Sequence, residues 1–137
     1  MVRGDVGPVI TYIDTSAAMK LLVQEDGSDA VAVFLQAAPD RVLVSSWLLH
    51  TELHRAARRH PDAVRLVDVS LVLETANLVD LTRGDLLTAS ALPGRLRSHD
   101  AVHLAVALRV AADEMVTYDD ELAEAARSAG LAVVAPR

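Results

Sequence analysis

The chain has 137 residues, of which 52% are hydrophobic, no cysteine and a net charge of −6. This length predicts one domain, residues 1–137, with its own core, and the hydrophobic fraction excludes a disordered chain. The lack of cysteine excludes disulfides and thiolate metal sites. No apolar run reaches the ~18 residues that span a bilayer. Residues 1–5 lack the apolar segment of a signal peptide, so we expect a cytoplasmic protein without membrane contact.

Short apolar runs alternate with segments of helical periodicity along the whole chain. The runs predict five strands, at 9–13, 41–45, 77–81, 114–118 and 131–134. The periodic segments predict helices at 16–23, from the break at 25–28 to about 37, and at 46–59, 62–75, 83–91, 99–111 and 120–129. Strands separated by helices predict an α/β fold, a three-layer α/β/α sandwich with a central parallel sheet.

Four carboxylates stand where an unpaired charge is costly. Asp14 and Asp119 each follow a predicted buried strand, Glu52 shares the apolar stripe of its helix, and Asp100 opens a helix with an apolar face. Because ligands of parallel sheets bind beyond the carboxyl ends of the strands, we expect Asp14 and Asp119 to meet there. Carboxylates that converge repel each other unless a cation lies between them. An oxygen-only set suits Mg²⁺ or Mn²⁺ and phosphate-ester chemistry.

Three of these acids also have a purely structural interpretation. Asp14 and Asp119 can each cap the helix that follows, and Asp100 can favour a helix N-terminus through the helix dipole. Glu52 has no such role, because it lies in the middle of a helix. The coincidence of all four therefore favours a shared site.

Hydroxyl and arginine side chains accompany the acids. Ser16 and Thr117 lie at the same predicted edge, where they would orient carboxylates or a metal-bound water, unless they serve only as helix caps. Arg55, Arg58 and Arg59 lie one to two turns beyond Glu52. Guanidinium groups suit bidentate phosphate contacts, so these arginines are candidates for contact with a phosphate backbone. The alternative is a solvated helix face, since the net negative charge does not itself indicate nucleic-acid binding.

Four segments, taken in chain order, resemble the four motifs of PIN domains. They are residues 12–17 (Tyr-Ile-Asp-Thr-Ser-Ala), 49–53 (Leu-His-Thr-Glu-Leu), 98–107 (Ser-His-Asp-Ala-Val-His-Leu-Ala-Val-Ala) and 117–119 (Thr-Tyr-Asp). The size and single-domain layout most resemble VapC-type toxins of bacterial toxin–antitoxin pairs. The resemblance implies a PIN-like fold and an Mg²⁺-dependent endoribonuclease, the toxin of a type II system, which cleaves RNA phosphodiester bonds with metal-activated water.

The resemblance also implies residue roles and partners. Asp14, Glu52, Asp100 and Asp119 would be the catalytic residues and would hold Mg²⁺, for which Mn²⁺ would substitute. The Thr-x-Asp spacing selects Asp119, although the adjacent Asp120 is open as the fourth ligand. The implied partners are RNA, a cognate antitoxin whose segment blocks the acidic pocket, and a second copy of the chain in a homodimer.

Two alternative interpretations compete with a magnesium nuclease. His50 and His54, like His99 and His103, are four residues apart, a spacing compatible with zinc. Glu52, however, lies about 200° around the helix from His50 and is not placed as in the zinc-protease motif, so we expect these histidines to be surface or partly buried neutral groups. The other alternative is a non-catalytic PIN-like module that binds RNA or protein, which metal-dependent cleavage would exclude.

Overall fold

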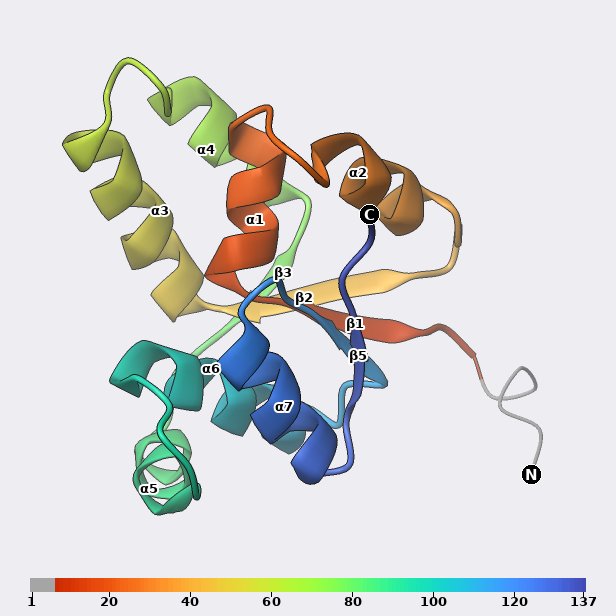
Figure 1. Ribbon diagram of the computed structural model, residues 1–137, viewed down its shortest axis with the longest axis vertical. Coiled ribbons are helices and arrows are strands. Elements are labelled where there is room, and N and C mark those ends of the chain that lie inside the picture. The colour runs from red at the N-terminus through yellow and green to blue at the C-terminus, as the bar shows by residue number, and fades with distance from the viewer. Residues whose placement is uncertain (1–6) are drawn as a thin grey trace.

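Five parallel strands form one sheet in the order β3-β2-β1-β4-β5, and helices cover both of its faces (Figure 1). The structure is a computed structural model that describes residues 7–137. The strands are β1 (Ile10–Ile13), β2 (Val42–Ser46), β3 (Asn77–Val79), β4 (Glu114–Val116) and β5 (Ala132–Val134). This architecture confirms the predicted α/β/α sandwich. The expectation about a signal peptide concerns residues 1–5, which lie outside the described residues.

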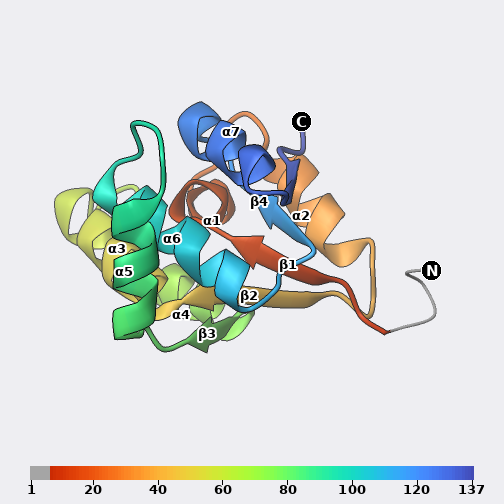
Figure 2. The same ribbon diagram turned by 90° about the horizontal axis from the view of Figure 1, so that it is seen from below.

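Within residues 7–137, seven helices connect the strands. They are α1 (Thr15–Leu22), α2 (Ser28–Gln36), α3 (Trp47–Arg59), α4 (Leu66–Glu74), α5 (Arg83–Ala91), α6 (Ser98–Arg109) and α7 (Asp120–Ser128). Helices α1 to α4 cover one face of the sheet, α6 and α7 cover the other, and α5 packs against α6 (Figure 2). Each predicted strand and helix is present, with shifted ends. None of these seven helices is long and apolar enough to cross a membrane.

One predicted boundary is wrong by more than a turn. The helix expected to begin at residue 62 begins at Leu66, because residues 61–64 form a turn. In this turn the N–H groups of Ala63 and Val64 bond to the carbonyl of His60, over 3.1 and 2.9 Å. Pro61 disfavours helical backbone angles in the residue before it, and His60 is indeed non-helical. Val64 is buried, so packing holds the turn in place.

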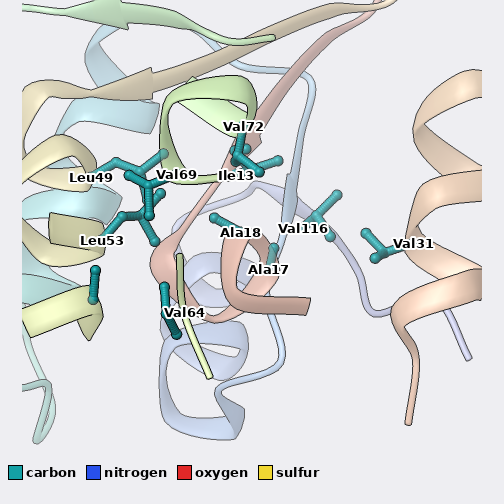
Figure 3. Packing of buried hydrophobic residues seen from close by; sticks show 11 residues of the cluster. Ile13, Ala17, Ala18, Val31, Leu49, Leu53, Val64, Val69, Val72 and Val116 are labelled. Carbon is teal, nitrogen blue, oxygen red and sulfur yellow. The ribbon is translucent and has the colours of Figure 1, made fainter. Parts of the chain in front are cut away.

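The alternating side chains of the strands divide the core into two halves. Toward α1–α4, Ile13 and Val116 meet side chains of these helices (Figure 3): Ala17, Ala18, Val31, Leu49, Leu53, Val69 and Val72. Toward α6 and α7, the strand residues Tyr12, Val44 and Met115 meet Leu104, Val106, Leu122 and Ala126. Full burial of each leucine contributes about 1.5–3 kcal/mol. Both faces of the sheet are therefore fixed by packing.

The order of the strands determines where a site can form. The central strands β1 and β4 are neighbours, with Ile13 opposite Val116. From β1 the chain continues to β2 on one side, and from β4 it continues to β5 on the other. The carboxyl ends of β1 and β4 therefore form a topological switch point, where open α/β sheets bind ligands. Asp14 and Thr117 directly follow these two strands, so they emerge side by side at this edge.

Candidate active site

Asp14 lies at the centre of a hydrogen-bond network and is only 2% exposed. It follows β1 and caps α1, where its Oδ1 accepts the N–H of Ala17 over 2.9 Å. The Ser16 hydroxyl donates to both carboxylate oxygens, over 2.8 and 2.9 Å, and the Thr117 hydroxyl donates to Oδ2 over 2.6 Å. Burial raises the pKa of Asp14, although the bonds from Thr117 and Ala17 oppose this. The carboxylate is thus held in one orientation.

The two hydroxyls beside Asp14 are themselves fixed by the backbone that follows β4. Ser16 Oγ accepts the N–H of Tyr118 over 2.8 Å, and Thr117 Oγ1 accepts the N–H of Asp119 over 3.1 Å. Each hydroxyl therefore accepts one hydrogen bond from the backbone and donates a hydrogen bond to Asp14. This arrangement links the end of β1 to the end of β4 through side chains, as well as through the strand pairing.

Glu52 approaches the same edge from α3. Its Oε1 accepts the Thr15 hydroxyl over 2.6 Å and lies 2.8 Å from Nε2 of His103. Burial alone would raise the pKa of Glu52, but the hydrogen bonds from His103 and Thr15 outweigh it and hold the pKa below its ordinary value. Glu52 is therefore ionised, in spite of its partly buried position on the apolar stripe of the helix.

Asp100 and Asp119 are both paired with the guanidinium group of Arg97. Arg97, which precedes α6, places Nε 3.5 Å from Asp100 Oδ2 and Nη2 3.3 Å from Asp119 Oδ2. His99 Nε2 lies 3.4 Å from the other oxygen of Asp100. Burial raises the pKa of Asp100, and the charge of Asp119 adds to that effect, whereas His99 and Arg97 oppose it. Asp119 also caps α7 through the N–H of Leu122, over 2.9 Å.

These side chains line one cleft of about 580 Å³. All four predicted acids and Ser16 belong to its lining, and so do Arg55 and Arg59. Thr117 is buried behind Asp14, and among the described residues the lining includes neither Arg58 nor Asp120. Four separate elements thus bring four carboxylates to one cleft, with two of the three candidate arginines.

The chemistry of this cleft suits a hard divalent cation, because the acids and Ser16 offer oxygen atoms only. In the arrangement seen here, however, no three Asp, Glu or His side chains of residues 7–137 lie close enough to hold one metal ion. Arg97 occupies the space between Asp100 and Asp119, and its side chain is 69% exposed. The residue types therefore fit Mg²⁺ or Mn²⁺, while in this arrangement Arg97 pairs with two of the four acids.

The histidine pairs do not form zinc sites in the described residues. The His54 ring stacks on His50, with centroids 4.1 Å apart, and its Nδ1 bonds to the His50 carbonyl. His103 is fully buried and uses both ring nitrogens, which corrects the expectation of surface or partly buried histidines. The other member of the second pair, His99, lies beside Asp100.

Sequence reasoning missed four residues of the site: Tyr12, Thr15, Arg97 and His103. Thr15 and His103 contact Glu52, Tyr12 contacts His103, and Arg97 bridges two acids. One signal was present, because His103 lies three residues after Asp100 among the apolar residues Val102 and Leu104 to Val106. A histidine in such surroundings needs polar partners.

The amino-acid sequence matches a known family over most of its length. The model of the PIN domain matches residues 11–128. Ribonuclease VapC46 of Mycobacterium tuberculosis is 37% identical over 133 residues, which cover 91% of this chain and 96% of that protein. Ribonuclease VapC35 of the same organism is 39% identical over 131 residues, with the same shares covered.

Solved structures with the same fold come from several bacteria. VapBC2 from Rickettsia felis, bound to a DNA fragment from its promoter, gives a TM-score of 0.75 at 13% identity, covering 92% of this chain and 98% of that one. VapC20 of M. tuberculosis, a sarcin-ricin loop cleaving toxin, gives a TM-score of 0.69 at 17% identity, and the match covers 92% of this chain and 99% of that one. A toxin–antitoxin complex from Klebsiella pneumoniae gives a TM-score of 0.67 at 19% identity, and the match covers 93% of this chain and 98% of that one. The chain belongs to the PIN-domain family and, within it, to the VapC group.

Proposed function

We propose that this protein is an endoribonuclease, the toxin of a type II toxin–antitoxin system, which hydrolyses RNA phosphodiester bonds with Mg²⁺ as cofactor. The observation that carries the proposal is the gathering of Asp14, Glu52, Asp100 and Asp119 in one cleft at the switch point of the sheet. The names of the M. tuberculosis relatives, which are ribonucleases, give independent support.

In this proposal the four carboxylates hold the cofactor, and Mn²⁺ substitutes for Mg²⁺. A bound divalent cation supplies an activated water and offsets the charge that develops on the phosphate. Ser16 and Thr117 hold Asp14 in a fixed orientation, as the bonds of 2.6–2.9 Å indicate. The short bonds of Thr15 and His103 do the same for Glu52.

Positive charge at the rim of the cleft would guide the RNA. Arg55 and Arg59 belong to the lining and extend from the same helix as Glu52. Their guanidinium groups can each contact a phosphate in bidentate fashion while the scissile group reaches the acids. The sequence predicts the same role for Arg58, but its position outside the lining makes it the weaker candidate.

We further propose a cognate antitoxin and a homodimer as partners, and the cytoplasm as the location. The K. pneumoniae neighbour was solved as a toxin–antitoxin complex. Large apolar side chains are exposed on two separate helices, Leu66, Val67 and Leu71 on α4 and Leu86 and Leu87 on α5. Exposed apolar side chains that lie together on one helix are typical of protein contacts, so each helix is a candidate for one of the two partners. Light scattering of the purified chain and co-purification from the native host test the two partners.

The decisive experiment compares wild type with Asp14→Asn on bacterial RNA, with Mg²⁺, with Mn²⁺ and with EDTA. We expect discrete cleavage with either cation, none with EDTA, and a loss of at least ~100-fold in the variant, since several kcal/mol of transition-state stabilisation would be lost. Asp120→Asn is the matched control, because its side chain is exposed and adjacent to Asp119. If Asp120→Asn is inactive while Asp119→Asn cleaves, the fourth ligand is assigned wrongly.

One observation favours the second candidate, a non-catalytic module that binds RNA or protein. The acids of the described residues do not converge on one point, and Arg97 already compensates two of them. Such a module would bind RNA or a partner equally well with and without a divalent cation. Cleavage that is equal in all variants and persists in EDTA would point to a contaminating nuclease. The non-catalytic module would then be the remaining candidate.

A further inference from the structure

A buried chain of hydrogen bonds runs from the interior of the sheet to Glu52. The Tyr12 hydroxyl lies 2.7 Å from Nδ1 of His103, and Nε2 of the same ring lies 2.8 Å from Glu52 Oε1. Tyr12 and His103 are both 0% exposed. The three residues come from β1, α6 and α3, so the chain crosses all three layers of the fold. Both nitrogens of the ring are engaged.

The ring of His103 lies between a hydroxyl and a carboxylate. Its Nδ1 is 2.7 Å from the Tyr12 hydroxyl, a group that can donate or accept a hydrogen bond. The Tyr12 hydroxyl also has side-chain hydrogen bonds with Ser45 and Ser46. Because an ionised carboxylate only accepts, the bond of 2.8 Å at Nε2 requires a proton on that nitrogen. Glu52 thus receives a donor from the ring.

This donor restricts how Glu52 can lie. Oε1 receives both the Thr15 hydroxyl, over 2.6 Å, and the His103 ring. Among residues 7–137, Oε2 has no recorded hydrogen-bond donor, so it is the oxygen left for a ligand in the cleft. Two donors on one oxygen fix the rotation of the carboxylate. A carboxylate rotated away from this orientation would lose at least one of these bonds.

From this geometry we propose that Tyr12 and His103 are positioning residues: Tyr12 holds the His103 ring in place, and Nε2 of the ring holds Glu52 in the orientation that binds the cation. The inference rests on the proposed function, since it assigns a role toward the same cofactor. Neither residue touches RNA or the reacting atoms. Their effect is exerted through Glu52 alone, in the way that outer hydrogen-bond partners orient metal ligands in other proteins.

A merely structural role for the pair makes different predictions. If Tyr12 and His103 only fill the core, their loss reduces stability and leaves the affinity for cations unchanged. The positioning role instead predicts a proton on Nε2 of His103 in the wild type and a loss of cation affinity in variants that are still folded. Tyr12→Phe separates the two roles, because it removes one oxygen atom and leaves the packed ring in place.

The first measurement needs no metal. Nitrogen–proton correlation spectra of wild type with ¹⁵N-labelled histidine, at neutral pH, should show a proton on Nε2 of His103, the nitrogen that faces Glu52. A ring that carries its only proton on Nδ1 would overturn the positioning role. Tyr12→Phe should keep the proton on Nε2, because Glu52 still accepts it, so the effect of this variant is read in the affinity for cations.

The second measurement is the dissociation constant for Mn²⁺, by calorimetric titration in the absence of RNA. His103→Leu should weaken binding about 10–100-fold, as losses of such outer partners typically do. His103→Gln should recover most of this, because its amide can donate to Glu52. Tyr12→Phe should lie between wild type and His103→Leu. Tyr118→Phe is the matched control, since its hydroxyl makes a bond of equal length, 2.7 Å, to the Pro136 carbonyl, and its affinity should be unchanged.

The outcomes separate this inference from the proposed function. Suppose that wild type binds Mn²⁺ and cleaves RNA, and that the three folded variants, Tyr12→Phe, His103→Gln and His103→Leu, bind Mn²⁺ as tightly as wild type does. Tyr12 and His103 are then structural, and the inference fails while the proposed nuclease function stands. If wild type binds no Mn²⁺, the proposed function fails and takes the positioning role with it. A graded loss with recovery in His103→Gln supports both.

Discussion

Replacing Thr117 by valine tests whether Asp14 is an ionised carboxylate held by its neighbours. Valine keeps the shape of threonine and suits an extended segment. It removes a hydroxyl that donates to Asp14 over 2.6 Å and accepts the Asp119 N–H over 3.1 Å. A bond to a charged group contributes about 1.5–3 kcal/mol and a neutral one about 0.5–1.5 kcal/mol, so the variant should lose about 2–4.5 kcal/mol at neutral pH.

Thermal denaturation followed by circular dichroism measures this loss, as a fall in Tm of about 6–15 °C. Thr75→Val is the matched control. The Thr75 hydroxyl makes a bond of the same length, 2.6 Å, to the neutral carbonyl of Val72, and the residue is exposed. Its loss should not exceed about 1.5 kcal/mol. Equal losses in the two variants would show that the charge on Asp14 adds nothing.

The dependence on pH gives the sharper test. Burial raises the pKa of Asp14 in the folded state, so the native protein binds this proton more tightly than the unfolded chain does. The contribution of Asp14 to stability therefore falls as pH rises from its ordinary pKa through its native pKa. Below both values Asp14 is neutral, the charged hydrogen bond is absent, and the difference between wild type and Thr117→Val should shrink. A difference of equal size in acid and at neutral pH would refute an ionised Asp14.

Further predictions concern the cation, Arg97 and the RNA. Without metal, Asp14→Asn should be at least as stable as wild type at neutral pH, because a buried charge is gone. Mn²⁺ at a hundredfold excess over its dissociation constant should add about 2.7 kcal/mol to the free energy of unfolding of wild type only. Thermal scans that show no such difference between the two proteins would contradict a shared acid site. Arg97→Gln should bind Mn²⁺ more tightly in calorimetry, since it no longer competes for two acids; weaker binding would contradict competition. Arg55→Gln with Arg59→Gln should flatten the salt dependence of RNA binding by up to ~1.4 units of slope, whereas Arg58→Gln, outside the cleft lining, should not.

The fold could be predicted because its signals are local. The apolar run that ends before Asp14 and the Leu92-Pro93-Gly94 segment after α5 each mark a boundary in a few neighbouring residues. The alternation of strands and helices then requires parallel pairing, and parallel pairing brings the ends of β1 and β4 to one edge. The position of the four acids in one cleft follows from these steps, which is why the sequence could suggest it.

The partners of those acids could not be predicted, because they depend on contacts between distant elements. His103 pairs with Tyr12, which lies 91 positions away, and with Glu52, 51 positions away. From the sequence, its four-residue spacing from His99 suggested a pair on one helix face. Arg97 reaches Asp119 across 22 positions, from a loop whose course no local pattern specifies. Side-chain partners of this kind are fixed only once the sheet order and helix packing are known.

The cleft combines two opposed electrostatic requirements, and their balance links its two proposed ligands. In the proposed function, Arg55 and Arg59 would attract a phosphate backbone to the cleft, while the four carboxylates would repel it. A cation held by the acids removes that repulsion, so cation and RNA should each bind more tightly in the presence of the other, by the same factor. Arg97 supplies part of this positive charge in the protein alone, through its contacts with two of the acids. The net charge of −6 is therefore no argument against an RNA substrate, because part of it lies where a cofactor would neutralise it.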